Sequence, residues 1–162
     1  MNSTALQYVK NKNVDHYSKN PVGFLKWIVE KLPNDKVIMG TGFGPPGIVL
    51  LDMLFKVTKN ISVFYIDTSF LFEQTHDLKT KLEVRYGFKF LKISTELTPD
   101  AQGKQYGEKL WESDPDACCN LRKVLPMKEA LADYDFWITG IRKKQTAMRA
   151  SAGLVEKEPR FS

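Results

Sequence analysis

The regular alternation of short apolar strands with helices is the feature that most constrains how this chain folds. Each predicted strand is followed by a segment whose apolar residues recur at helical spacing. Strands that alternate with helices of this length form a parallel sheet joined by right-handed crossovers. The sequence therefore predicts an α/β fold with a doubly wound, mostly parallel sheet. The predicted strands cover residues 36–39, 61–66, 88–93 and 136–139.

Capping residues show where several of the predicted helices begin and end. Asn20 and Pro21 suit the N-cap and first position of a helix whose apolar residues continue to Leu32. Gly87 is typical of the C-cap of a helix over residues 73–86. Pro126 either separates the last two predicted helices or begins the second of them. The other helices are predicted over residues 48–55, 102–111, 116–124 and 127–131.

The chain has no evident linker, repeat or low-complexity tract. Its 162 residues are enough for one compact domain with a proper core. We expect residues 1–35 to form an N-terminal helical segment and residues 36–162 to form the α/β part of that domain. The sequence contains no apolar run of the roughly 18 residues that span a bilayer, and its first residues lack an apolar leader. We therefore expect a cytoplasmic protein that does not bind membranes.

The adjacent pair Cys118-Cys119 holds the only two cysteines of the sequence. Consecutive Cα atoms lie about 3.8 Å apart, which is too close for the usual geometry of a disulfide. Arg122 and Lys123 follow the pair, and nearby cations favour the thiolate form that binds metals. The pair therefore suits a metal or cluster, although one buried and one incidental cysteine remains an alternative.

Three polar or glycine-rich stretches follow predicted strands, and in open parallel sheets ligands bind at that edge. Residues 40–47 are rich in glycine and could bind an anion through backbone N–H groups, but they match neither a Walker A loop nor a dinucleotide fingerprint. Residues 67–69, Asp-Thr-Ser, could bind a nucleoside or form a helix-capping turn. Residues 140–149 contain four cations that could bind phosphate or sulfate, or form a solvated face, within a net charge of +5.

Four ordered motifs carry a resemblance to a known family. They are Thr-Gly-Phe-Gly at residues 41–44, Phe-Tyr-Ile-Asp-Thr at 64–68, Cys-Cys-Asn-Leu-Arg-Lys-Val at 118–124 and Gly-Ile-Arg-Lys-Lys-Gln-Thr-Ala-Met-Arg at 140–149. In this order they resemble the assimilatory adenylylsulfate (APS) and phosphoadenylylsulfate (PAPS) reductases. The resemblance implies the adenine nucleotide alpha-hydrolase-like fold, with a modified PP-loop, and makes residues 36–162 a nucleotide-binding domain.

The resemblance also implies roles for individual residues. The double cysteine marks the branch with a four-iron four-sulfur (4Fe-4S) cluster, whose substrate is generally APS. Cys118 and Cys119 would be metal ligands, and Lys123 would lie between the cluster and the substrate sulfate. Arg142 and Arg149 are candidates for binding the oxyanion during catalysis. The residues that would contact the substrate are Thr41, Gly42, Phe43, Gly44, Asp67, Thr68, Gly140 and Lys143.

We therefore expect a sulfonucleotide reductase of sulfate assimilation and cysteine biosynthesis, which reduces APS or PAPS to sulfite with thioredoxin or glutaredoxin. Two features depart from the family pattern: glycines and prolines replace the usual PP-loop serines, and no cysteine follows Cys119. The second departure removes the nucleophile and two cluster ligands, so we expect this chain alone to be inactive. The alternative is a catalytically incomplete adenine-nucleotide-binding domain. Another PP-loop enzyme and a nucleic-acid binder fit the motifs less well, and a homo-oligomer stays open.

Overall fold

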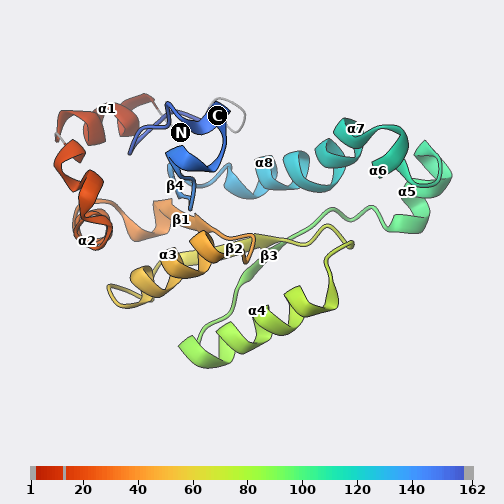
Figure 1. The fold of residues 1–162 in the computed structure, drawn as a ribbon, viewed down its shortest axis with the longest axis horizontal. Helices are drawn as coiled ribbons and strands as arrows, with labels where there is room; N and C mark the ends of the chain where they lie inside the picture. Colours follow the sequence, from red (N-terminus) through yellow and green to blue (C-terminus); the bar gives the residue numbers. More distant parts are fainter. Residues whose placement is uncertain (1–2, 13, 159–162) are drawn as a thin grey trace.

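A four-stranded, fully parallel sheet forms the centre of the computed structural model, which describes residues 3–12 and 14–158 (Figure 1). Its strand order is β3-β2-β1-β4, with parallel pairs β1–β2, β1–β4 and β2–β3. The predicted α/β fold is therefore confirmed. The strands are β1 Val37–Gly40, β2 Ser62–Ile66, β3 Leu91–Ile93 and β4 Phe136–Ile138.

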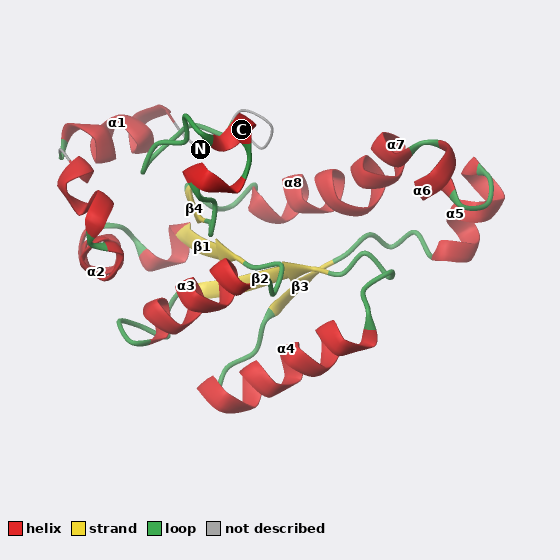
Figure 2. Cartoon of the chain, in the orientation of Figure 1, coloured by secondary structure: helices red, strands yellow, loops and turns green. Residues whose placement is uncertain are grey.

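Helices cover both faces of this sheet, as expected for a doubly wound arrangement (Figure 2). Successive strand residues point to opposite faces, so Val37 and Met39 of β1 join one apolar core while Ile38 joins another. The larger core includes residues of α2 (Pro21–Lys31), α3 (Pro45–Phe55) and α4 (Glu73–Tyr86). The smaller core packs β1, β2 and β3 against α8 (Leu125–Leu131). Because both faces of β1 are covered, its first three residues, Val37, Ile38 and Met39, are fully buried.

The N-terminal segment packs onto the sheet domain through its apolar side chains. It contains α1 (Ser3–Asn11), a 3₁₀ helix over Val14–Lys19 and α2. Asn20 caps α2 as predicted, because its Oδ1 accepts the N–H of Gly23 at 2.9 Å. Val9, Val14 and Leu25 are buried in the same core as the strand residues. The segment therefore shares its hydrophobic core with the α/β part.

The chain between β3 and β4 forms a long helical arm that extends from the sheet (Figure 1). Gly107, at φ 92°, ends the first helix and splits the single helix predicted over residues 102–111. Beyond it, the helix with the two cysteines continues through a π-helical turn into α8, which has Pro126 in its first turn, so the alternative in which Pro126 begins the second helix is confirmed. The arm consists of α5 Pro99–Tyr106, α6 Leu110–Ser113, α7 Pro115–Cys119, the π turn Asn120–Val124 and α8.

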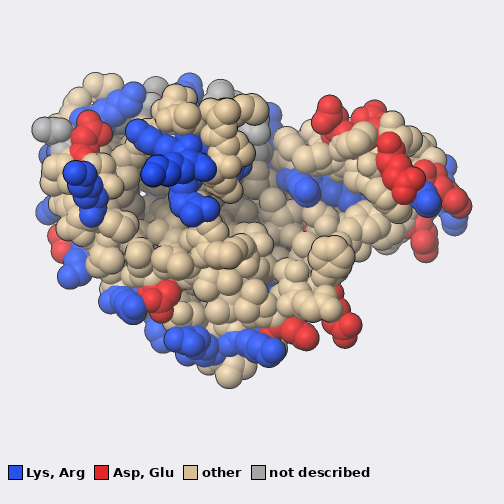
Figure 3. Space-filling model, in the orientation of Figure 1, with Lys and Arg blue, Asp and Glu red and all other residues tan. Residues whose placement is uncertain are grey.

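Two 3₁₀ turns, Lys143–Gln145 and Ala147–Arg149, follow β4. They carry the predicted basic segment, and Figure 3 shows Lys and Arg side chains gathered over this part of the surface and acidic side chains at the tip of the arm. Among the described residues, no helix is long and apolar enough to cross a membrane.

Candidate functional site

A cavity of about 850 Å³ lies at the carboxyl ends of β1 and β2, and we refer to it as the cysteine cavity. Its walls come from the loops after β1 and β2, from Trp137 of β4 and from the helical arm. This is the edge of a parallel sheet where ligands bind. Six of the predicted site residues line the cysteine cavity together: Thr41, Gly42, Thr68, Cys118, Cys119 and Lys123.

The glycine-rich loop after β1 is held by Thr41, which is buried. Its Oγ1 accepts the N–H of Phe43 at 3.1 Å, and Phe43 adopts a left-handed backbone with φ 58°. Gly44 is the N-cap of α3, and Pro45 and Pro46 occupy the first turn. Because proline has no N–H, that turn offers fewer anion-binding donors than the glycine content predicted.

Close backbone packing explains two of the glycines around this loop. A Cβ on Gly47 would lie 2.8 Å from Thr41 Oγ1, and a Cβ on Gly140 would lie 3.3 Å from the backbone nitrogen of Gly47. Gly140 follows β4, so its missing side chain lets the end of β4 lie directly against the glycine-rich loop. The structure thus brings Gly140 beside this loop, although Gly140 does not line the cysteine cavity.

The turn after β2 is stabilised by hydrogen bonds from its own backbone N–H groups to the side chains of Asp67 and Thr68. Asp67 Oδ1 accepts the N–H of Ser69 at 3.0 Å, and Thr68 Oγ1 accepts the N–H of Phe70 at 3.3 Å. The residues do not cap α4, whose N-cap is Phe72. Burial acts to raise the pKa of Asp67, but the N–H of Ser69 and the ammonium group of Lys92, 3.2 Å away, outweigh it and lower that pKa. Asp67 is therefore held ionised beside the cavity.

The two cysteines differ in exposure, and the residue four positions after each cysteine has the same burial as that cysteine. Cys118 and Arg122 are buried, whereas Cys119 and Lys123 are exposed. Residues four apart lie on the same side of a helix, and all four line the cysteine cavity. Lys123 therefore has an exposed ammonium group beside the more accessible thiol.

Arg122 is the functional candidate that sequence reasoning missed, because it was considered only as a cation near the thiols. Its Nε donates to Gln102 Oε1 at 2.6 Å and its Nη1 to the carbonyl oxygen of Thr68 at 3.0 Å. Its guanidinium carbon lies 4.7 Å from the centre of the Phe70 ring. Burial lowers the pKa of Arg122, and Cys118 opposes that shift. The spacing of four residues from Cys118 was the sequence signal that could have identified it.

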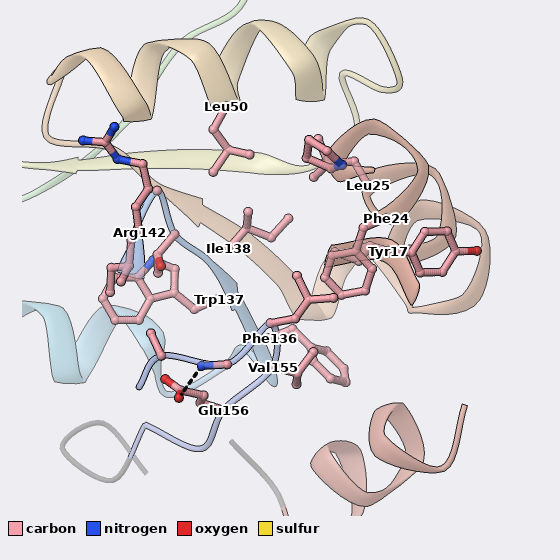
Figure 4. A pocket seen from close by; sticks show the side chains of 18 of the residues that line it. Tyr17, Phe24, Leu25, Leu50, Phe136, Trp137, Ile138, Arg142, Val155 and Glu156 are labelled. Carbon is pink, nitrogen blue, oxygen red and sulfur yellow. Dashed lines mark hydrogen bonds between the residues drawn. The ribbon is translucent and has the colours of Figure 1, made fainter. Parts of the chain in front are cut away.

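The remaining predicted residues lie away from the cysteine cavity. The ring of Phe43 packs in the core, with its centre 5.0 Å from that of Phe90. Arg142 and Gly140 line a second cavity, also about 850 Å³, between α2, α3, β4 and residues 152–158. Apolar side chains of these elements face that second cavity in Figure 4. Lys143 and Arg149 lie on the 3₁₀ turns after β4 and line neither cavity.

The cysteine cavity fits one side of a cluster site. Among the described residues, no three Cys, His, Asp or Glu side chains gather where they could hold a metal ion. A four-thiolate cluster needs twice the thiols present in this sequence. The neighbouring Nη2 of Arg122, however, is buried without an acceptor, as expected beside an anionic group. Cys118 and Cys119 therefore fit two of the ligand positions.

Comparisons with known proteins identify the family. The model of the phosphoadenosine phosphosulfate reductase domain matches residues 36–162. The adenosine 5′-phosphosulfate reductase of Halalkalibacterium halodurans is 38% identical over 144 residues, which are 88% of this chain and 62% of that protein. The enzyme of the same name from Salinibacter ruber is 36% identical over 149 residues, covering 92% of this chain and 59% of that protein.

A solved structure agrees with these sequence matches. The crystal structure of phosphoadenylyl-sulfate (PAPS) reductase from Candida auris, a phosphate complex, superimposes with a TM-score of 0.70 and 33% identity. The match covers 83% of this chain and 69% of that one. The chain therefore belongs to the phosphoadenosine phosphosulfate reductase domain family and has its PP-loop-like fold. It spans about 62% of the length of the curated relative from H. halodurans.

Proposed function

We propose that this chain is the nucleotide- and sulfate-binding part of a sulfonucleotide reductase that acts on APS. The observation that supports this best is the cysteine cavity, which gathers Thr41, Thr68, the cysteine pair and Lys123 from separate segments. The curated relatives are named for adenosine 5′-phosphosulfate, which favours APS over PAPS. A thiol-dependent reductase with a reduced cysteine pair suits the cytoplasm.

Each predicted residue has a part in this proposal. Residues 41–44 would border the phosphosulfate, Asp67 and Thr68 the nucleoside, and Gly140 the adenine. The ammonium group of Lys123 would neutralise the sulfate, because a nucleophile approaching a dianion is repelled unless fixed cations reduce that charge. Arg142, Lys143 and Arg149 do not line the cysteine cavity. We propose that these exposed cations attract the anionic substrate from a distance.

The proposed reaction has a defined electron balance. In the reductase of which this chain would be a part, a thiolate other than Cys118 and Cys119 attacks the sulfate sulfur, the bond from that sulfur to the bridging phosphate oxygen breaks, and AMP leaves with that oxygen. A dithiol such as thioredoxin or glutaredoxin then releases sulfite and becomes a disulfide, so the sulfur gains two electrons. Cys118 and Cys119 would hold a 4Fe-4S cluster, which when bound would supply a polarising group next to the substrate sulfate.

A second candidate function follows from the cysteine count. If Cys118 and Cys119 both bind the cluster, the sequence has no further thiol to attack sulfur. The chain would then bind adenylylated ligands without reducing them. Calorimetric titration with APS, PAPS and AMP tests the shared part of both proposals, and absence of binding by all three would contradict both.

A sulfite-release assay separates the two functions. The protein is incubated anaerobically with APS, thioredoxin and dithiothreitol, and sulfite is measured over time. Sulfite formed by this chain would show that one of its own thiols attacks sulfur and would support the reductase, whereas APS binding without sulfite is expected when Cys118 and Cys119 both hold a cluster. Omission of thioredoxin and of APS in turn provides the controls.

A further inference from the structure

Arg122 is a buried cation that no carboxylate within the described chain neutralises. The residue is 1% exposed and forms no ion pair with any of the described residues. Its two hydrogen-bond acceptors, the side-chain oxygen of Gln102 and the backbone oxygen of Thr68, are both neutral. Arginine is rarely buried to this degree without an anionic partner.

The contacts that Arg122 makes with the described residues leave one of its donor atoms, Nη2, without a partner. The ring of Phe70 offers a cation–π contact, which is a weaker interaction than a full counter-charge in the interior. The Nη2 atom is enclosed and has no acceptor at all. A buried donor without an acceptor is destabilising, so such an atom meets a water or an ion in the native site, and the uncompensated charge of Arg122 favours an anion.

The position of Arg122 shows where that anion belongs. Arg122 lies four residues after Cys118, on the same side of the helix, and both line the cysteine cavity. Arg122 lies within the π turn Asn120–Val124, which ends with the N–H of Leu125 bound to the carbonyl oxygen of Asn120. Such π turns are frequent at functional sites. The thiol group of Cys118 lines the same cavity, and its chemistry supplies a negative charge when a metal binds.

We infer that the counter-ion of Arg122 is the anionic metal–thiolate group held by Cys118 and Cys119. Arg122 is thus a positioning residue, which neutralises the metal–thiolate group. Its hydrogen bonds also link Gln102 of the helical arm and the carbonyl group of Thr68, in the turn after β2, to the helix that carries the two cysteines. This inference deepens the proposed function and rests on its thiolate metal site. The inference also predicts that metal binding by Cys118 and Cys119 stabilises the packing around Thr68.

Substitution of Gln102 by Glu tests whether Arg122 lacks a negatively charged partner in the metal-free protein or only forms a structural hydrogen bond. The variant Gln102→Glu places a carboxylate where an amide oxygen now accepts from Arg122. We expect the metal-free variant to unfold about 2–4 °C higher than wild type, because the buried cation gains a partner. Cd²⁺, the thiolate probe, should then raise the midpoint less than it raises that of wild type.

The matched control is Gln105→Glu, which adds the same charge to an exposed position of the same helix. It should leave both the metal-free midpoint and the Cd²⁺-induced rise unchanged. An equal Cd²⁺-induced rise in Gln102→Glu and wild type would overturn the inference. A lower metal-free midpoint for Gln102→Glu would overturn it as well.

A second variant decides the question if Gln102→Glu does not fold. Arg122→Met keeps an apolar stem of similar reach but no charge, and should weaken Cd²⁺ binding about tenfold, followed by sulfur-to-cadmium absorbance. Arg122→Lys should restore part of that affinity. Unchanged Cd²⁺ affinity in Arg122→Met, or a wild-type protein whose thiols bind no Cd²⁺, overturns the inference. APS titration is independent of this readout, so the proposed function can fail while the role of Arg122 stands.

Discussion

The cysteine cavity and the second cavity have the same volume, about 850 Å³, but differ in what lines them. The cysteine cavity collects two thiols, two threonines and two cations from segments far apart in the sequence. The second cavity is lined mainly by apolar side chains of α2, α3, β4 and residues 152–158 (Figure 4). Small-ligand sites combine an apolar wall with a few convergent polar groups; charged residues line both cavities, but only the cysteine cavity is lined by the two cysteines. Volume alone therefore does not identify the site.

The variant Lys123→Met tests this contrast with the largest expected effect. Lys123 is exposed and lines the cysteine cavity, so we propose that its ammonium group binds the substrate sulfate directly. Loss of a charge-assisted hydrogen bond of about 1.5–3 kcal/mol corresponds to APS affinity about 10- to 100-fold weaker. The measurement is calorimetric titration with APS. Lys128→Met, an exposed lysine of α8 outside both cavities, is the control and should bind like wild type.

The variant Gly140→Ala probes the close contact between the end of β4 and the glycine-rich loop. An added Cβ would lie 3.3 Å from the backbone nitrogen of Gly47 and 3.4 Å from the carbonyl carbon of Pro46. The glycine-rich loop must then shift by a few tenths of an ångström, and we expect APS affinity about fivefold weaker, or about 1 kcal/mol. Gly103→Ala, where a Cβ meets nothing within 4 Å, is the control. Equal affinity in the two variants would show that the loop does not contact the ligand.

The sequence predicted the sheet well because strand burial is encoded locally. The fully buried residues of β1 and the capping residues Asn20 and Gly87 needed no tertiary information. The helical arm was predicted less well, because the positive φ of Gly107 and the π turn before Pro126 depend on packing. The role of Gln102 could not be predicted at all, since a glutamine that accepts from a buried arginine looks like any exposed glutamine in the sequence.

The structure brings only some of the predicted site residues to one cavity, for a similar reason. Thr41 and Thr68 follow β1 and β2, whose carboxyl ends lie at one edge of the sheet, so topology alone brings them together, whereas Cys118 near the end of α7 reaches this edge through the packing of the helical arm. Phe43 belongs to the same motif as Thr41 and Gly42, yet its side chain packs in the core, and Arg142 belongs to a motif that contributes no residue to the cysteine cavity. A motif fixes which segments meet, whereas side-chain direction depends on the local backbone, such as the positive φ of Phe43.

The variant Asp67→Asn tests the charged turn beside the cysteine cavity through the pH dependence of stability. The pKa of Asp67 is lowered in the folded protein, so its charge stabilises the fold above the unfolded pKa of about 3.9. That contribution is lost as the pH falls through the lowered pKa. We expect wild type to unfold about 2–4 °C above Asp67→Asn at pH 7 and to lose this advantage below pH 4. A difference that does not change with pH would show that the carboxylate charge is not the cause.

The variant Arg142→Met should have the smallest effect, because Arg142 is exposed and lines the second cavity, not the first. If it only attracts the substrate from a distance, its removal lowers the association rate of APS about two- to threefold, and added salt abolishes the difference. A direct sulfate contact would instead raise the dissociation rate at every salt concentration. Stopped-flow binding at two ionic strengths separates these outcomes, and Leu50→Phe, which fills the second cavity without changing charge, should bind like wild type.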